Sequence, residues 1–462
     1  MSRGDDGDTP RVLVVTDSDS YVKWGASLAN QIPKDWSVRL VLARSNAEPS
    51  RRQLAEALEG SRFDRDEPTR VGLADLRRLL SEWQPDVLVA ATRGPAVQAM
   101  IGLIANEPDR PVIVSGLAGI AVPVIPYGLG FRRAVDLFVL HSKRELREFA
   151  EASERLGIPH TYELATLPFL ASAPKPAESD SMRRRDRVEP VRDRIIFAAQ
   201  ALVPAPRKQR TWLLRQLIET ARAHPHLEVV IKVRARAGEP QTHAEHFSYE
   251  ELLAGLAHEG ELIPANLVVE SGAMSRHLQR AVGLVSVSST SLLEAIAEGV
   301  PVLGLTDFGV GADQINLVLL RSGLLGTARD LVAGSFQHPE PEWLDDNYFH
   351  DLADNTWLAA VERLLEQRAT YGLSPYPELP ATLLNRTREF FYRHFAFASE
   401  QGSRVEIMES RLLAIGIWGN RRRGELIRAA DHCRDLMGFG PFERERWAKT
   451  HQISGVRGRW RR

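Results

Sequence analysis

Three consecutive hydroxyl residues lie at the point of the chain that is most informative about chemistry. Ser288, Ser289 and Thr290 follow an apolar run at 283–286 that is typical of a buried strand, and a helical pattern begins directly after them. Ligands of open parallel sheets bind at the carboxyl ends of the strands, and the first N–H groups of a helix favour a phosphate there. Hydroxyl groups add hydrogen-bond donors without adding charge. The segment therefore predicts a phosphate-binding sheet edge.

The start of the same helix also has a structural explanation. Ser291 and Glu294 have the spacing of a capping box, in which the serine caps the helix and the glutamate side chain reaches back to it. Ser291 is therefore expected to be structural. Ser288–Thr290 are not needed for this cap, and we expect them to contact a ligand.

Basic side chains follow a second predicted strand, at 227–233. Lys232 and Arg234 lie at its end, where cations suit a diphosphate or a carboxylated sugar, because a guanidinium can grip two oxygens at once. His243, a little further on, is a candidate to bind or protonate a departing phosphate. An ordinary charged surface loop is the alternative. Four more residues are candidates for donor binding: Glu239 and Thr242 in the same segment, and Arg207 and Lys208 after the predicted strand 194–199.

The segment from Glu294 onward resembles the donor-binding region of GT-B glycosyltransferases. The motifs that carry the resemblance are the helical Glu-Ala at Glu294, the tetrapeptide GVPV at 299–302 and the segment GADQIN. In that family the matching glutamate binds the donor ribose. Asp313, Gln314 and Asn316 are similar to the residues of UDP-GlcNAc transferases that contact the donor sugar.

A second resemblance concerns the two strand ends. The Ser-Ser-Thr run at 288–290 is similar to the motif with which bacterial sialyl-, polysialyl- and Kdo-transferases bind a CMP moiety. Lys232 matches the lysine of their Lys-x-His-Pro strand end, where Arg234 here replaces the histidine. Together the resemblances imply a nucleotide-sugar donor as substrate, no cofactor, and protein donors in place of a metal at the leaving phosphate.

Two aspartates follow the first predicted strand, at 11–16. Asp17 and Asp19 have the spacing of a metal-binding Asp-x-Asp pair, with Lys23 one helical turn further on, but a helix N-cap explains Asp19 equally well. In GT-B enzymes an acidic or histidine residue of the first domain often deprotonates the acceptor hydroxyl. The resemblance therefore implies Asp17 or Asp19 as the general base, and we expect no metal site.

The hydrophobic pattern predicts the elements that position these residues. Short Val-, Ile- and Leu-rich runs alternate with amphipathic stretches, which is typical of parallel strands buried between helices. We predict an α/β fold of two Rossmann-like, doubly wound domains facing a cleft in the GT-B arrangement, with bridging carboxy-terminal helices. The predicted parts are an acceptor domain at 1–170, a linker at 171–193, a donor-nucleotide domain at 194–345 and a helical extension with a basic tail at 346–462. The predicted strands are 11–16, 37–43, 86–91, 112–115 and 137–140, then 194–199, 227–233, 267–270, 283–286 and 301–305.

Composition excludes several other classes of protein. The chain has 462 residues, 59 basic and 60 acidic, so its net charge of -1 gives no global field for nucleic acid. A single cysteine and a polar start without an apolar signal core predict a cytoplasmic protein. The uncharged segment 111–131 contains prolines and glycines, so we interpret it as a strand and a loop rather than a membrane span. The arginine clusters after 421 predict a solvated tail, with peripheral contact to the inner face of a membrane as the alternative.

These features together predict a glycosyltransferase that moves a sugar from a nucleotide-sugar donor to a cell-surface polysaccharide or a lipid-linked glycan. No phosphate loop, nucleophile elbow, His-Glu-x-x-His or zinc-ligand cysteine set occurs in the sequence. Two alternatives stay open. One is an enzyme of the same shape that transfers no glycosyl group, such as a sugar-nucleotide epimerase or a polyol-phosphate transferase, and the other is a non-catalytic nucleotide-binding protein.

Overall fold

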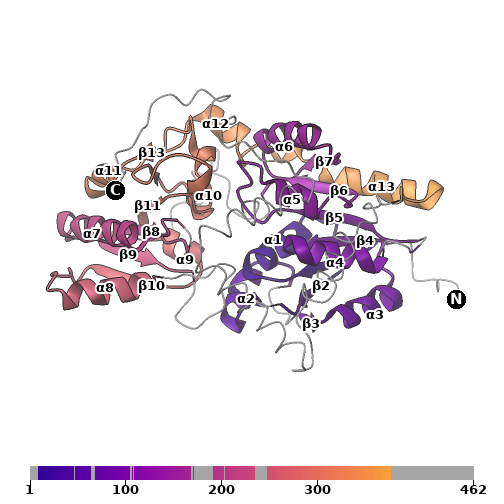
Figure 1. Ribbon diagram of the computed structural model, residues 1–462, viewed down its shortest axis with the longest axis horizontal. Helices are drawn as coiled ribbons and strands as arrows, with labels where there is room; N and C mark the ends of the chain where they lie inside the picture. The colour runs from indigo at the N-terminus through magenta and orange to yellow at the C-terminus, as the bar shows by residue number, and fades with distance from the viewer. Residues whose placement is uncertain are drawn as a thin grey trace, which may run out of the picture.

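The computed structural model describes residues 9–375 except 46, 64–67, 105–106, 108, 168–169, 171–190, 202 and 235–246. They form two α/β domains that lie side by side (Figure 1). Within both sheets, every strand pair is parallel. The predicted fold class is confirmed, because parallel strands buried on both faces need a helical layer on each side.

The first domain contains a seven-stranded sheet with the order β3-β2-β1-β4-β5-β6-β7. Its strands are β1 (Arg11–Thr16), β2 (Ser37–Ala43), β3 (Thr69–Val71), β4 (Val87–Ala91), β5 (Val112–Gly116), β6 (Leu137–Leu140) and β7 (Tyr162–Leu164). Its helices are α1 (Asp19–Ala29), α2 (Arg51–Leu58), α3 (Leu73–Trp83), α4 (Gly94–Ile104), α5 (Pro126–Phe131) and α6 (Lys143–Leu156).

The second domain contains a six-stranded sheet with the order β10-β9-β8-β11-β12-β13. Its strands are β8 (Arg194–Ala198), β9 (Glu228–Lys232), β10 (Leu267–Glu270), β11 (Ala281–Ser286), β12 (Val302–Leu305) and β13 (Leu325–Gly326). Its helices are α7 (Arg207–Ala223), α8 (Tyr249–His258), α9 (Met274–Leu278), α10 (Ser291–Ala297) and α11 (Ala328–Val332), and short 3-10 turns lie at Ala312–Gln314 and Leu317–Leu319.

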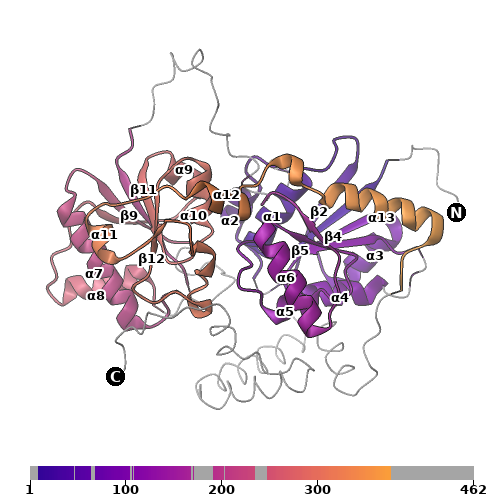
Figure 2. The same cartoon turned by 90° about the horizontal axis from the view of Figure 1, so that it is seen from above.

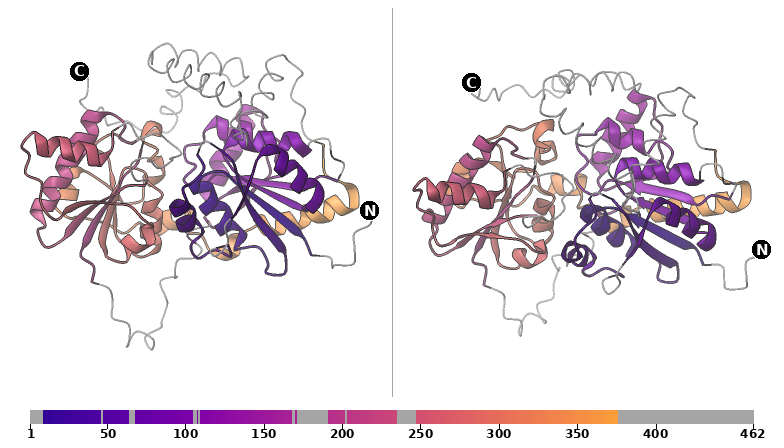
Figure 3. Two further views of the ribbon diagram at one scale, coloured as in Figure 1. Left: turned by 90° about the horizontal axis from the view of Figure 1, so that it is seen from below. Right: turned by 60° about the horizontal axis from the view of Figure 1, so that its bottom comes forward.

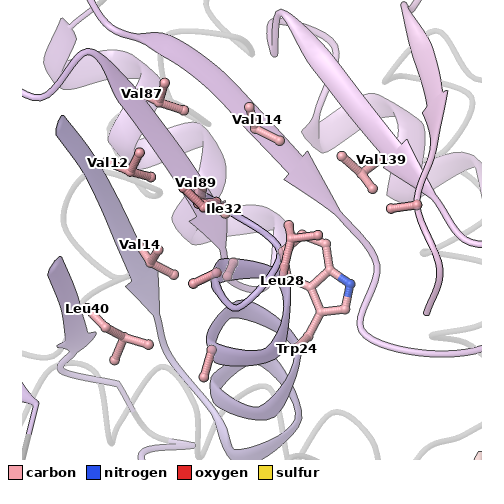
Figure 4. Close-up of a cluster of buried hydrophobic side chains, with 14 of the residues drawn as sticks. Val12, Val14, Trp24, Leu28, Ile32, Leu40, Val87, Val89, Val114 and Val139 are labelled. Atoms are coloured by element: carbon pink, nitrogen blue, oxygen red, sulfur yellow. The ribbon is translucent and has the colours of Figure 1, made fainter. Parts of the chain in front are cut away.

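Alternation along the central strand builds one core on each face of the first sheet. Val12 and Val14 belong to the cluster that Trp24 of α1 covers (Figure 4), whereas Leu13 and Val15 belong to the cluster on the opposite face. All of these side chains are fully buried. Burial of both faces therefore fixes the register of β1, and with it the position of the polar residues that follow this strand.

The chain returns to the first domain after it has completed the second. Helix α12 (Pro341–Asp346) contacts α6 through an ion pair of Asp346 with Arg147 at 2.8 Å. Helix α13 (Trp357–Tyr371) lies along the first domain (Figures 2 and 3), where Trp357 joins the buried cluster and donates its Nε1–H to Gln31 at 3.0 Å. These two helices confirm the predicted bridge. The rest of the predicted helical extension, from 376 on, and its arginine-rich tail lie outside the described residues.

The predicted strands all form, with ends that differ by one or two residues. Three strands were not predicted, namely β3, β7 and β13, because runs of only two or three residues leave no periodic signal. Segment 111–131 forms β5 and a loop, as expected, and also the short helix α5, which was not predicted. Among the described residues, no helix combines the length and the apolarity that a membrane span requires.

Candidate active site between the two domains

Both sheets reverse their strand order beside their first strand, between β1 and β4 and between β8 and β11. Ligands of doubly wound sheets bind outside the carboxyl ends of the strands at such reversal points. Asp17 and Asp19 follow β1, Lys232 ends β9, and Ser288–Thr290 follow β11. In each domain, the predicted site residues thus lie at the carboxyl edge of that domain's own sheet.

The hydroxyl run after β11 is held by a glutamine that the sequence did not single out. Gln200, which follows β8, accepts the Ser288 N–H through Oε1 at 3.0 Å and donates from Nε2 to the Ser288 Oγ at 3.0 Å. Ser288 is buried. The only sequence signal for Gln200 was its place after a predicted strand, because glutamine carries no signature of its own.

The predicted capping box at α10 is wrong. Thr290 is the N-cap residue of α10, and the Ser291 N–H donates to the Ser289 Oγ at 3.2 Å. The Glu294 carboxylate does not turn back to the helix start but accepts from the Lys23 ammonium at 2.8 Å. A cation supplied by the other domain thus outcompetes the local cap, and Glu294 is directed toward the first domain.

A second ion pair joins the same two edges. Arg234, after β9, donates from Nε and Nη2 to the Asp19 Oδ2 at 2.9 and 2.7 Å, and also contacts the Ser20 hydroxyl. The two cross-domain pairs bring together candidates that the sequence had assigned to different domains. They are Asp19 and Lys23 from the first domain, and Arg234 and Glu294 from the second.

Lys232 lies between these charges. The pKa of its ammonium is lowered to about 8, chiefly by burial; the charge of Glu294 opposes this shift, and the charges of Arg234 and Lys23 add to it to a smaller extent. Lys23 and Arg234 are each paired with a carboxylate, so an anionic ligand at the end of β9 would act chiefly on the buried ammonium of Lys232.

Asp17 has a different environment from Asp19. Its side chain is fully buried, and its Oδ2 accepts from the backbone N–H of Arg93 at 3.2 Å and from the Arg93 Nε at 2.8 Å. Its Oδ1 is buried and has no hydrogen-bond partner among the described residues. The two aspartates therefore face different arginines, and Asp19 is the one at the contact between the domains. In the described ranges, no group of three or more His, Cys, Asp or Glu side chains has the arrangement of a metal site.

The remaining candidates have varied surroundings. Asn316 is buried, and its amide accepts from the Gly311 N–H at 3.0 Å and donates to the Gly309 carbonyl at 3.1 Å, so it shapes the loop after β12. Asp313 and Gln314 lie in the 3-10 turn of that loop. Three candidates lie outside the described residues: Glu239, Thr242 and His243.

Arg207 and Lys208 lie in the first turn of α7. Both are exposed, and they follow the carboxyl end of β8, so they lie beyond the same sheet edge as Gln200. Arg210, one turn into the helix, is buried and donates to the Gln200 carbonyl at 2.8 Å.

A histidine at the end of β6 is structural. The Trp24 Nε1–H donates to the His141 Nε2 at 2.7 Å, so Nδ1 carries the proton and donates to the Ala165 carbonyl at 3.0 Å. Burial lowers the pKa of His141 to about 4, with a smaller opposing effect of the Ala165 hydrogen bond. His141 is therefore neutral near pH 7 and acts in packing.

Two Rossmann-like domains that meet at the carboxyl edges of their sheets have the GT-B architecture of glycosyltransferases and related epimerases. Residues 12–364 match the model of a family described as "Putative glycosyltransferase (DUF6716)". The chain belongs to this family. The glycosyltransferase class expected from the donor-region motifs is thus confirmed, while the finer families that these motifs resemble are not tested by this match.

Solved structures resemble the chain in fold. A "putative UDP-N-acetylglucosamine 2-epimerase" from Listeria monocytogenes is 14% identical, with a TM-score of 0.50 over 81% of this chain and 100% of that one. The UDP-GlcNAc 2-epimerase from Neisseria meningitidis bound to UDP-GlcNAc is 11% identical, with a TM-score of 0.47 over 77% and 100%. A UDP-glucosyltransferase from Polygonum tinctorium is 13% identical, with a TM-score of 0.41 over 85% and 100%. No curated protein sequence matches the chain.

Proposed function

We propose that the chain transfers a sugar from a nucleotide-sugar donor, held by the second domain, to a hydroxyl group of an acceptor bound by the first. The observation that carries this proposal is the pairing of Asp19 and Lys23 with Arg234 and Glu294 across the domain contact. It brings a carboxylate of one domain beside the cations of the other, which is what a base and a phosphate site need in order to act on one substrate pair.

The donor site consists of the residues after β9 and β11. Lys232 and Arg234 neutralise the diphosphate, Ser288–Thr290 donate hydrogen bonds to it, and Glu294 accepts from the ribose hydroxyls. The lowered pKa of Lys232 supports this role, because its main cause is burial of the ammonium, and an anion beside it would stabilise the buried charge. These side chains take the place of a metal ion at the leaving group.

Asp19 is the general base of the proposed reaction. It takes the proton of the acceptor hydroxyl while that oxygen attacks the anomeric carbon, and the bond from this carbon to the phosphate oxygen breaks. The nucleoside diphosphate leaves with the electron pair, beside Lys232 and Arg234. The proposed acceptor is a cell-surface polysaccharide or its lipid-linked precursor, and the arginine-rich tail is a proposed peripheral contact with a membrane.

The first experiment is a thermal-shift panel with CMP, UDP, GDP, ADP and their sugar conjugates. A ligand at about 100 times its dissociation constant stabilises the folded chain by roughly 2.7 kcal/mol. We expect one nucleotide class to raise the melting temperature, and Arg234→Gln to lose that shift. Arg276→Gln is the matched control, because Arg276 also pairs across the domains, with Glu59 at 3.5 Å.

Product analysis then separates transfer from its alternatives. The donor that binds is incubated with and without glycan acceptors, and we expect the nucleotide to be released as the sugar joins the acceptor. If the sugar nucleotide is converted to an epimer in the absence of acceptor, the chain is an epimerase and the proposed glycosyl transfer is wrong. If the nucleotide binds but no product forms under any condition, the chain is a non-catalytic nucleotide-binding protein.

A further inference from the structure

We infer that Gln200 is a positioning residue that fixes the direction of the Ser288 hydroxyl proton, and so makes Ser288 a hydrogen-bond donor to the ligand. The inference rests on the proposed donor site after β11. It assigns a role to a residue of another strand, because Gln200 follows β8, the neighbour of β11 in the sheet.

The orientation of the Gln200 amide follows from its partners. The backbone N–H of Ser288 can only donate, so the atom 3.0 Å from it is Oε1. Nε2 therefore faces the Ser288 Oγ, also at 3.0 Å, and can only donate to it. The hydroxyl of Ser288 thus accepts from the amide.

The Ser288 hydroxyl has one proton, and its hydrogen bond to Gln200 Oε1 is long, at 3.4 Å. Oε1 also accepts from the Ser288 N–H at 3.0 Å and lies 3.3 Å from the Ser286 Oγ, so a ligand oxygen at a shorter distance is the better acceptor for this proton. Ser286 donates to the Ala198 carbonyl at 2.9 Å. The Ser288 proton is therefore available to a ligand atom that accepts hydrogen bonds, such as a phosphoryl or carbonyl oxygen.

A buried arginine holds the glutamine in place. Arg210 donates from Nη1 to the carbonyl of Gln200 at 2.8 Å and to that of Pro204 at 3.3 Å, and its guanidinium lies 4.3 Å from the ring centre of Tyr249. Both hydrogen-bonding and stacking fix its planar group. The backbone of Gln200 is thus anchored by α7 while its side chain reaches across to Ser288.

The test is a double-mutant cycle of Gln200→Leu and Ser288→Ala, with the dissociation constants of UDP and CMP measured by calorimetry on the full chain. We expect Gln200→Leu to raise the dissociation constant by on the order of tenfold in the wild-type background. In the Ser288→Ala background the same substitution should have an effect that is smaller by a factor of about three or more. Gln279→Leu, an exposed glutamine of the same domain, is the control and should leave binding unchanged.

A second variant separates positioning from packing. Gln200→Glu keeps the shape of the side chain but accepts at both oxygens, so the Ser288 proton turns toward it and away from the ligand. We expect weaker nucleotide binding with a melting temperature close to that of the wild type. Equal losses for Gln200→Leu in both backgrounds overturn the inference and leave the donor site intact. A wild-type chain that binds no nucleotide overturns the proposed function instead.

Discussion

The buried ion pair after β1 gives the sharpest test of how the first domain is held together. The Asp17 side chain is 1% exposed and that of Arg93 is 30% exposed, and the Arg93 Nε lies 2.8 Å from the Asp17 Oδ2. Arg93→Met removes the cation and leaves the carboxylate buried, with the backbone N–H of residue 93 still 3.2 Å away. A buried charge that loses its partner destabilises strongly, because water cannot replace the lost interaction.

The two halves of the pair differ in how much their loss should cost. Breaking a buried pair typically costs 3–5 kcal/mol, and partial exposure of Arg93 favours the low end, about 3 kcal/mol for Arg93→Met. Asp17→Asn leaves an amide oxygen as acceptor and an arginine that can reach water, so we expect about 1 kcal/mol. The asymmetry follows from the different exposure of the two side chains and from the acceptor oxygen that asparagine keeps.

Urea unfolding of the full chain, followed by far-UV circular dichroism and tryptophan fluorescence, measures both values. For a domain of this size, about 3 kcal/mol corresponds to a decrease of roughly 6–12 °C in melting temperature. Arg78→Met is the control, since Arg78 is 67% exposed in its pair with Asp75 and should cost less than about 0.5 kcal/mol. A loss below 1 kcal/mol for Arg93→Met, or a larger loss for Asp17→Asn, refutes the reasoning.

Two further predictions concern stability. Burial lowers the pKa of His141 to about 4, so below pH 6.5 the unfolded chain binds a proton that the folded chain does not. Through this residue the free energy of unfolding should fall by about 2 kcal/mol from pH 7 to pH 5. Urea titrations at both pH values should show that His141→Gln removes this contribution to the pH dependence. An unchanged slope in the variant contradicts the assignment. Gly283→Ala would place a Cβ 2.4 Å from the ring of Phe336 and should cost about 1–3 kcal/mol, whereas Gly255→Ala, in open space on α8, should cost nothing. Equal melting temperatures for the two alanine variants would contradict that packing argument.

The sequence predicted the sheets well because their strands are buried on both faces. Every residue of β4 is buried, as is every residue of β1 after the first, so each strand is visible in the sequence as a nearly continuous apolar run. In contrast, β3 and β13 contain three and two residues, and their pairing depends on β2 and β12 rather than on any pattern of their own. Short edge strands therefore form because of tertiary contacts with a neighbouring strand, and their own sequence does not predict them.

Only those residues of the candidate site that directly follow a strand could be predicted from the sequence. Ser288–Thr290 and Lys232 follow from the rule that ligands bind at carboxyl edges. The partner of Glu294 did not follow, because Lys23 lies 271 residues away in the sequence and the local spacing equally suits a helix cap. Gln200 was missed for a related reason, since its role depends on a hydrogen bond to a neighbouring strand.

The proposed mechanism requires that the ion pair between Asp19 and Arg234 at the domain contact breaks before Asp19 acts as a base. Asp19 cannot accept a proton from an acceptor efficiently while it is paired with Arg234, because the guanidinium stabilises the carboxylate. The Arg234 side chain is 43% exposed and that of Asp19 is 21% exposed, and ion pairs with this much solvent contribute only about 0–1 kcal/mol. A diphosphate carries more negative charge than one carboxylate, so it can displace Asp19 from Arg234 at little cost. The proposed mechanism thus requires the donor to bind first, because its phosphates are what free the base.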